Sequence, residues 1–304
     1  MATSAPPHAV SRGVRRITLD AAGVTLSGLL SEPEVQPPRA AVVALHGGGM
    51  SAGYFDGQAH PDVSLLALGA SLGYTLLAVD RPGYGGSAAR LPDGATLAEQ
   101  AALLHAALRS FARRYAVGEG VFLLAHSYGG KVALTTAADD AGRPGLIGLD
   151  VSGCGHRYAT VPGEPWPPAG VRARTRNWGP LGLYPPDTFR ASAATVAPIP
   201  EREQGEAARW PELFPGIAAR VRVPVRLTFA QHESWWRHDD HDIADLTARL
   251  AAPRVVVERQ RDAGHNISLG WAARSYHLRA LAFLEECLAA RAARPAAAPG
   301  PGTG

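Results

Sequence analysis

The chain alternates short apolar runs with segments of helical periodicity. Eight runs are predicted as strands: residues 14–20, 24–30, 40–45, 75–79, 121–125, 146–151, 225–229 and 254–258. Helical periodicity covers residues 63–72, 97–115, 130–138, 243–250 and 275–292. Six of the eight runs are almost continuously apolar, which is typical of strands buried on both faces of a parallel sheet. The first two runs are closely spaced and more polar, so we expect an antiparallel hairpin at the sheet edge.

Residues 156–220 interrupt this alternation. They are rich in Pro, Trp and Arg and contain no clear strand. Because a structureless loop of this length is uncommon in a compact domain, we expect a helical lid over the active edge of the sheet, with helices near residues 186–195 and 201–210. Its aromatic side chains are expected either to line a pocket or to form the lid's own small core: Trp166, Trp178, Tyr184 and Trp210.

The predicted architecture is an α/β fold with a mostly parallel eight-stranded sheet, helices on both faces, and the lid inserted after the sixth strand. Residues 14–155 and 221–293 form its core. Residues 1–13 and the Pro/Ala/Gly-rich residues 294–304 carry too little apolar surface to order themselves, so we expect both ends to be disordered.

The composition is that of a soluble globular protein, with 46% hydrophobic and 19% charged residues. No run of about 18 apolar residues predicts a membrane span. The first residues lack the apolar stretch of a signal peptide, so we expect a cytoplasmic protein. Cys154 and Cys287 lie far apart without the spacing of metal ligands, which argues against a disulfide framework or a zinc site.

The basic excess is small. The formal net charge is +3, and Lys131 is the single lysine beside many arginines. This bias, with abundant Ala, Gly and Pro, is typical of GC-rich coding, as in actinobacteria. The chain has no long basic run and no interleaving of basic and aromatic residues, so nucleic acid is not expected as a partner.

The fifth predicted strand ends in Ala125-His126-Ser127-Tyr128-Gly129, and a helical segment follows. In a nucleophile elbow, a strand delivers a serine to a sharp, strained turn that exposes its hydroxyl oxygen. Small residues flank that serine because the strand and helix backbones lie close together. Ser127 is therefore the candidate nucleophile. Taken alone, the pentapeptide also fits a surface serine in a glycine-rich turn, so the other strand ends must decide.

The third predicted strand is followed by H-G-G-G-M at residues 46–50. A glycine-rich turn at this place can direct backbone N–H groups to a developing oxyanion. Gly48 and Gly49 are the candidate donors there, together with Tyr128 after the serine. A flexible loop is the alternative interpretation of the glycines.

A carboxylate and a histidine follow the last two predicted strands, at Glu233 and His265. A glutamate can accept a hydrogen bond from the imidazole N–H and stabilise the imidazolium, although its extra methylene needs a deeper setting. Four other carboxylates remain open as the acid: Asp150, Asp239, Asp240 and Asp242. The histidines beside the serine and the acid are expected in structural or solvated positions: His126, His232, His238 and His241.

Four motifs stand in the order and spacing of the α/β-hydrolase superfamily: H-G-G-G, D-R-P-G-Y-G-G-S, A-H-S-Y-G-G and A-G-H. The order serine, acid, histidine is also that of the superfamily. Over residues 15–290 the chain resembles this superfamily, and most closely the lidded esterases, thioesterases and C–C hydrolase-like enzymes of bacterial secondary metabolism. It departs from the usual pattern at Ala125, which replaces a glycine, and at Glu233, where Asp is common. We expect the second motif, residues 80–87, to brace the serine turn.

The resemblance implies a serine hydrolase that needs no cofactor and no metal. His265, oriented by Glu233, would deprotonate Ser127 for attack on an ester, thioester or lactone of a small, natural-product-like molecule. Side chains expected to contact this substrate are Met50, Trp178, Tyr184 and Trp235. Two alternatives stay open. One is a lyase that expels acetate from an acetylated, tetronate-like intermediate with the Ser–His pair as proton shuttle, and the less favoured one is a non-catalytic receptor.

Two features near the expected site have plain structural interpretations. Arg172, Arg174 and Arg176 are expected on a solvated face of the lid, the alternative being contact with an acidic substrate or with a carrier protein that holds the substrate. Cys154, just after the sixth predicted strand, is expected to be a small buried filler, because a serine nucleophile is already present.

Overall fold

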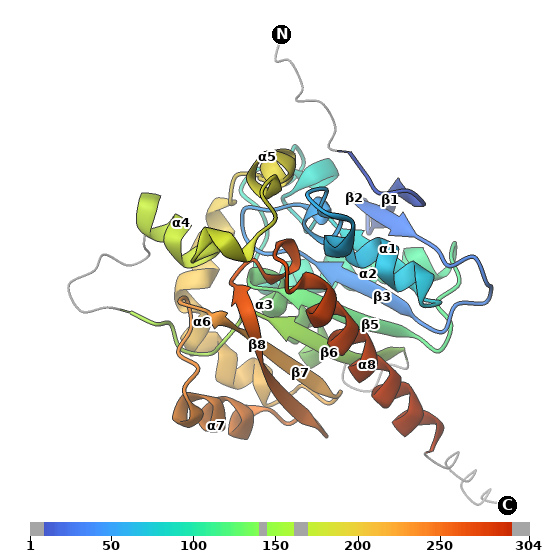
Figure 1. Cartoon of the computed structure of the whole chain (residues 1–304). Helices are drawn as coiled ribbons and strands as arrows, with labels where there is room; N and C mark the ends of the chain where they lie inside the picture. The colour runs from blue at the N-terminus through green and yellow to red at the C-terminus, as the bar shows by residue number, and fades with distance from the viewer. Residues whose placement is uncertain (1–8, 140–144, 161–169, 294–304) are drawn as a thin grey trace, which may run out of the picture.

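The computed structural model describes residues 9–139, 145–160 and 170–293. Within them lies one sheet in the order β1-β2-β4-β3-β5-β6-β7-β8 (Figure 1). Its strands are β1 Val14–Ala21, β2 Val24–Ser31, β3 Ala41–Leu45, β4 Thr75–Val79, β5 Val121–His126, β6 Leu146–Ser152, β7 Val225–His232 and β8 Val255–Gly264. Strands β3 to β8 are parallel, whereas β2 pairs antiparallel with both β1 and β4. The predicted parallel sheet with an edge hairpin is confirmed.

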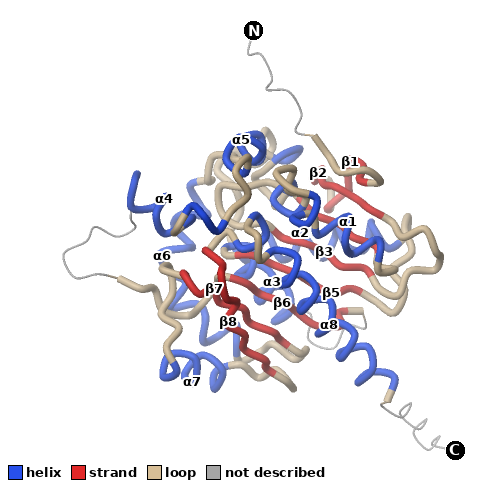
Figure 2. The backbone as a smooth tube through the Cα atoms, viewed as in Figure 1, coloured by secondary structure: helices blue, strands red, loops and turns tan. Residues whose placement is uncertain are grey.

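Helices cover both faces of the sheet (Figure 2). The α-helices are α1 Leu65–Ser71, α2 Leu97–Ala112, α3 Tyr128–Asp139, α4 Gly170–Trp178, α5 Thr188–Ser192, α6 Glu201–Ala218, α7 Asp240–Arg249 and α8 Ala273–Ala292. Buried side chains of α1 and α8 form one apolar cluster with the sheet, and those of α2, α3, α6 and α7 form the other. The central strands β3 and β4 are buried at every position, which explains their uninterrupted apolar sequence.

Between β6 and β7 the chain makes an excursion, residues 153–224, which we call the insertion. It carries α4, α5 and α6, and β8 ends beside α4 (Figure 1). The sequence did not predict α4, and it placed the end of the last insertion helix at Trp210. Helix α6 instead continues to Ala218 past two prolines, because Trp210, Phe214 and Ile217 bury their side chains on the sheet side. That burial outweighs the backbone hydrogen bonds that the prolines remove.

At the N-terminal end, the folded part of the chain begins earlier than the sequence indicates. Val10 packs against the core, and the Ser11 N–H donates to Asp56 Oδ2 at 2.9 Å. Residues 9–13 therefore belong to the folded body, although they were expected to be disordered. Trp166 and residues 294–304 lie outside the described residues. Across the part of the chain that the structure describes, no helix is long and apolar enough to cross a membrane.

The turn at Ser127 is the tightest point of the fold. β5 ends at His126 and α3 begins at Tyr128, which leaves a single residue between them. Ser127 occupies the left-handed region with φ +53°, a strained conformation for a residue other than glycine. A Cβ on Gly129 would stand 2.2 Å from the carbonyl oxygen of Leu45 on β3. The helix and the neighbouring strand thus touch through their backbones.

Gly129→Ala is expected to destabilise the protein strongly, because its methyl group meets backbone that cannot move without separating α3 from β3. We expect a loss of several kcal/mol, in the range of about 3 kcal/mol or more for severe overpacking, measured by chemical denaturation. Gly205→Ala on α6 is the matched control, since nothing lies within 4 Å of its Cβ. That control is expected to be neutral or stabilising by up to about 1 kcal/mol. Equal stabilities of the two variants would contradict the close contact.

Lys131 ties α3 to the insertion. Its side chain is buried, and its ammonium lies 5.2 to 5.6 Å from the centres of four aromatic rings, those of Tyr128, Tyr158, Trp210 and Trp236. The Nζ atom donates to the Tyr158 hydroxyl at 2.8 Å. Burial lowers the pKa of Lys131 to about 8, against the smaller opposing effects of Cys154 and Glu203. The ring faces also favour the charged form.

The stability of the wild type is expected to rise relative to that of Lys131→Met as pH increases from about 8 to 10. The unfolded chain keeps its lysine proton up to its ordinary pKa near 10.5, whereas the folded chain loses it from about pH 8, so in this window the unfolded state binds more protons. The gain is expected to reach up to about 3 kcal/mol, measured by urea denaturation at each pH. A difference that stays constant over this window would mean that the four rings keep the ammonium charged.

Candidate active site

Three side chains from different strand ends form one hydrogen-bonded row. Ser127 Oγ lies 3.1 Å from His265 Nε2, and His265 Nδ1 lies 2.7 Å from Glu233 Oε2. The other carboxylate oxygen of Glu233 accepts the Trp235 N–H at 2.8 Å. The side chains of Glu233 and His265 are almost completely buried, whereas Ser127 is half-buried. This arrangement can move a proton from the serine to the histidine and hold the resulting imidazolium beside a carboxylate.

The pairing of the last two strands explains this placement. β7 and β8 both run further than the sequence indicates, and His232 pairs with Gly264 beyond an irregularity in the ladder. The next residue on each strand is Glu233 and His265, so strand register alone makes them neighbours. Burial by itself would raise the pKa of Glu233, but the charge and hydrogen bond of His265 outweigh it and leave the pKa below its ordinary value.

The other four carboxylates are engaged elsewhere. Asp150 is buried and bonded to Arg226 and to the Tyr276 hydroxyl. Each of the remaining three has its own partner in or beside α7: Asp239 caps the helix, Asp240 pairs with Arg259, and Asp242 pairs with Arg237 and Arg157. Among the five candidate acids, the structure brings Glu233 to the histidine.

Two backbone segments approach the serine, the start of α3 and the glycine turn after β3. Tyr128 is the first residue of α3, where an N–H has no acceptor within the helix. A Cβ built on Gly47 would lie 3.1 Å from Ser127 Cβ, so the glycine turn after β3 abuts the serine. Gly49 is a correction to the sequence prediction, since its N–H donates to the Tyr84 hydroxyl at 3.2 Å. Among the described residues no protein acceptor takes the N–H of Gly48, which leaves it with Tyr128 as the candidate donors.

His126 has a role that the sequence did not reveal. It is buried, its ring stacks on Tyr54 at 4.8 Å, and its Nδ1 lies 3.1 Å from Ser152 Oγ. The ring centre is 4.7 Å from that of His265. Burial, followed by the proximity of His265, depresses the pKa of His126 well below its ordinary value. A neutral imidazole therefore supports the flank of His265 without competing for its proton.

The residues expected to contact the substrate divide into half-buried and buried positions. Trp178 is half-buried and packs on Tyr184 and Phe189, with ring centres 5.1 and 4.7 Å away. Trp235 is half-buried with its ring centre 6.3 Å from that of His265. Met50 and Tyr184 are buried in the apolar cluster of α1 and α8 instead. Trp210 is fully buried, and its Nε1 donates to the Gly155 carbonyl at 2.8 Å, so it belongs to the core beneath α6.

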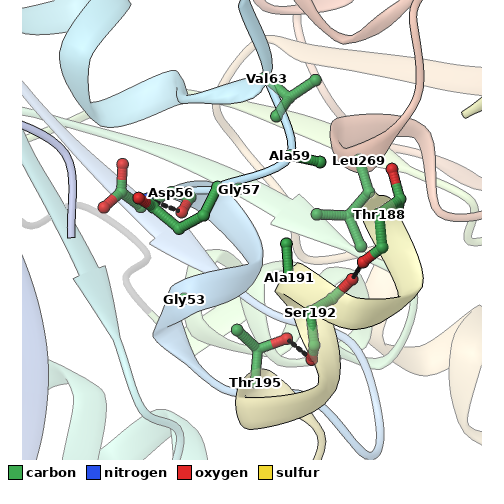
Figure 3. Close-up of a pocket in the computed structure, with 11 residues that line it drawn as sticks. Gly53, Asp56, Gly57, Ala59, Val63, Thr188, Ala191, Ser192, Thr195 and Leu269 are labelled. Atoms are coloured by element: carbon green, nitrogen blue, oxygen red, sulfur yellow. Dashed lines mark hydrogen bonds between the residues drawn. The ribbon is translucent and has the colours of Figure 1, made fainter. Parts of the chain in front are cut away.

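Where the insertion meets the body of the protein under α5, only a small gap remains. Figure 3 shows Thr188, Ser192 and Thr195 facing Gly57 and Leu269 across it. The cavity measures about 10 Å³, which is room for about one water molecule. None of its lining residues belongs to the row of serine, histidine and carboxylate. At this point helix α5 is therefore packed closely on the core.

The two other features near the site are structural. Arg176 is buried and donates to the backbone carbonyls of Ala159 and Ser234, so it does not face solvent as the sequence suggests. Cys154 is buried, and its desolvation raises the pKa of the thiol to about 12, as fits an unreactive filler. Among the described residues no group of three or more His, Cys, Asp or Glu side chains could hold a metal ion.

The chain is similar to solved structures of several hydrolases. These are the Cif epoxide hydrolase from Acinetobacter nosocomialis (14% identity, 91% of this chain and 90% of that one, TM-score 0.66), the thioesterase domain from the curacin biosynthetic pathway (13%, 88% and 99%, 0.61) and a highly thermostable carboxyl esterase from Bacillus coagulans (14%, 91% and 100%, 0.66). At such identities the likeness shows the fold. No curated protein sequence matches the chain. The sequence profile of the alpha/beta hydrolase family matches residues 42–282. With most of its length covered by that profile and the eight-stranded sheet in place, the chain belongs to the alpha/beta hydrolase family.

Proposed function

We propose that the protein is a serine hydrolase that cleaves an ester, thioester or lactone of a small molecule. The observation that carries the proposal is the row Ser127–His265–Glu233, with a 3.1 Å contact at the serine and a 2.7 Å contact at the carboxylate. The strained φ of Ser127 supports it further, because backbone strain of this kind accumulates at reactive positions.

In the proposed reaction, His265 Nε2 takes the proton of Ser127 as Oγ attacks the substrate carbonyl. The N–H groups of Gly48 and Tyr128 donate to the oxygen on which negative charge develops. Glu233 accepts the Nδ1–H of His265, which fixes the tautomer and stabilises the imidazolium. His265 then returns the proton to the leaving group, and water attacks the acyl-enzyme by the same proton path.

We also propose that the insertion serves as a lid, with boundaries near residues 156–220. Its support is the contrast between the half-buried Ser127 and the buried His265 and Glu233. Trp178 stands close to the end of β8, since its carbonyl oxygen would lie 2.5 Å from a Cβ on Gly264. The end of α4 thus lies against the segment that carries His265, where the Asn266 N–H also donates to the Asn177 carbonyl at 3.2 Å. Two finer expectations stay predictions: that the substrate is a natural product, and that a carrier protein holds it.

Ser127→Ala is expected to lower kcat for an aryl ester by roughly a thousandfold or more, because no other group supplies the nucleophile. The melting temperature is expected to stay near that of the wild type. A fluorophosphonate should label the wild type at Ser127, detected by peptide mass spectrometry, and should leave the variant unlabelled. Ser71→Ala, at the exposed end of α1, is the matched control and should behave as wild type. Wild-type turnover by Ser127→Ala would rule out covalent catalysis.

Turnover of an acetylated substrate with a hydrogen on the carbon next to the acetoxy-bearing carbon, run in ¹⁸O-labelled water, separates the reaction classes. Acyl hydrolysis puts one water oxygen into the released acid in each turnover. The lyase alternative, in which the Ser–His pair shuttles a proton, releases an alkene and an unlabelled carboxylate. A folded wild type that neither turns over esters nor reacts with the fluorophosphonate would favour a receptor instead.

Glu233→Gln is expected to lower kcat by roughly 10²- to 10⁴-fold with a smaller effect on KM, since a carboxamide cannot stabilise the imidazolium and favours the wrong tautomer. The lowered pKa of Glu233 also means that its charge stabilises the fold above the ordinary carboxyl pKa and ceases to do so as pH falls through the lower folded value. The stability difference between wild type and variant should therefore shrink in acid. Asp240→Asn, an exposed carboxylate on α7, is the control; a variant at residue 233 as active as this control would exclude Glu233 as the acid.

A further inference from the structure

A fully buried guanidinium lies behind the glycine turn that follows β3. Arg81 Nε donates to the carbonyl of His46 at 2.7 Å, and Nη2 donates to that of Gly47 at 3.2 Å. The backbone N–H of Arg81 also donates to His46 Nε2 at 3.1 Å. Three hydrogen bonds from one residue therefore fix the two positions that precede Gly48.

The counterion of Arg81 comes from the insertion. Glu203 on α6 is 1% exposed and accepts from Arg81 through both oxygens, at 2.8 Å from Nη1 and 2.9 Å from Nη2. Such a bidentate contact holds the guanidinium in one plane, which a single hydrogen bond would not do. The carboxylate also touches the turn directly, because a Cβ on Gly48 would lie 3.2 Å from Glu203 Oε1.

Tyr84 connects the same carboxylate to the far side of the turn. Its hydroxyl donates to Glu203 Oε1 at 2.8 Å and accepts the Gly49 N–H at 3.2 Å. The residues on both sides of Gly48 are thus held by groups that converge on Glu203. Arg81 and Tyr84 belong to the 80–87 motif, whereas Glu203 lies more than a hundred residues further along the chain.

Stability does not explain a buried charge pair of this kind. Taking two charges out of water costs more than their attraction commonly returns, and apolar residues of similar volume would serve as well. What the pair does provide is a fixed backbone conformation, since its hydrogen bonds hold backbone carbonyls and one N–H around Gly48.

We propose that Glu203 is a positioning residue for the reaction: through Arg81 and Tyr84 it sets the conformation of the glycine turn and so aims the Gly48 N–H at the developing oxyanion. The inference rests on the proposed function. It makes the first turn of α6 a fixed part of the active site.

The test compares an aryl ester with the thionoester that has the same acyl and leaving groups. A thiono sulfur is a poorer hydrogen-bond acceptor than a carbonyl oxygen, so its hydrolysis depends less on aimed N–H groups. In Glu203→Gln, kcat for the ester is expected to fall roughly 10- to 100-fold, the ester-to-thionoester ratio to fall with it, and KM to stay within about threefold. Glu201→Gln, an exposed carboxylate on the same helical turn, is the matched control and should keep the wild-type ratio.

Folding is checked by circular dichroism, and active sites are counted by fluorophosphonate titration. Should Glu203→Gln fail to fold, Arg81→Met/Glu203→Met leaves no unpaired buried charge and is expected to show the same lowered ratio. An unchanged ratio in a folded variant, or an equal loss of kcat for ester and thionoester, would overturn the positioning role. A wild type that hydrolyses neither substrate and resists the fluorophosphonate would overturn the proposed function, and this inference with it.

Discussion

The backbone contact between Gly129 and Leu45 is the constraint on which the site depends. It brings the start of α3 against the end of β3, so that a single residue, Ser127, must complete the turn in a left-handed conformation. Because the glycine turn continues directly from Leu45, the same contact places Gly47, and with it the start of that turn, beside the serine. The positions of the Ser127 hydroxyl and of both candidate N–H donors thus depend on this one close contact between α3 and β3. The acid and the histidine depend on a second, independent constraint, the register of β7 and β8.

Two buried cations hold the insertion to this arrangement. Both contact the ring of Tyr128, whose centre lies 4.8 Å from the Arg81 guanidinium and 5.2 Å from the Lys131 ammonium. Arg81 reaches α6 through Glu203, and Lys131 reaches it through the face of Trp210. Tyr128, the proposed oxyanion donor, is therefore braced through its side chain by the helix that covers it. Cations in such places need partners on every side, which links the insertion to the core more specifically than apolar packing does.

Much of this fold could be predicted from the sequence because it depends on contacts between residues that are close together in the chain. Continuous apolar runs give the strands, and small residues around Ser127 give the turn, since both reflect contacts between near neighbours in the chain. The extension of β8 to Gly264 was missed because residues after 258 are polar and pair only in register with β7. Helix α6 was cut short at its prolines, although tertiary burial carries it on.

Hydrogen-bond partners that lie far apart in the sequence could not be predicted from local sequence patterns. Nothing local distinguishes Gly48 from Gly49; the difference is made by the Tyr84 hydroxyl, 35 residues away. Glu203 looks like any solvated glutamate in the first turn of a helix, and its burial against Arg81 depends on how the insertion docks. The row itself was predictable as a set of residues, whereas its geometry required the strand register. The identity of the substrate stays a prediction for the same reason. The side chains that would contact it belong to segments that meet only in the folded chain.

Lys131 has a consequence for how the protein can be handled and modified. It is the single lysine in the sequence, and it is 3% exposed inside its cage of rings. Lysine acylation, ubiquitin-type conjugation and amine coupling to a solid support therefore find no accessible lysine side chain on the folded protein. Trypsin likewise has only arginines to cleave after while the fold holds. The residue that joins helix to insertion also leaves the surface without lysine chemistry.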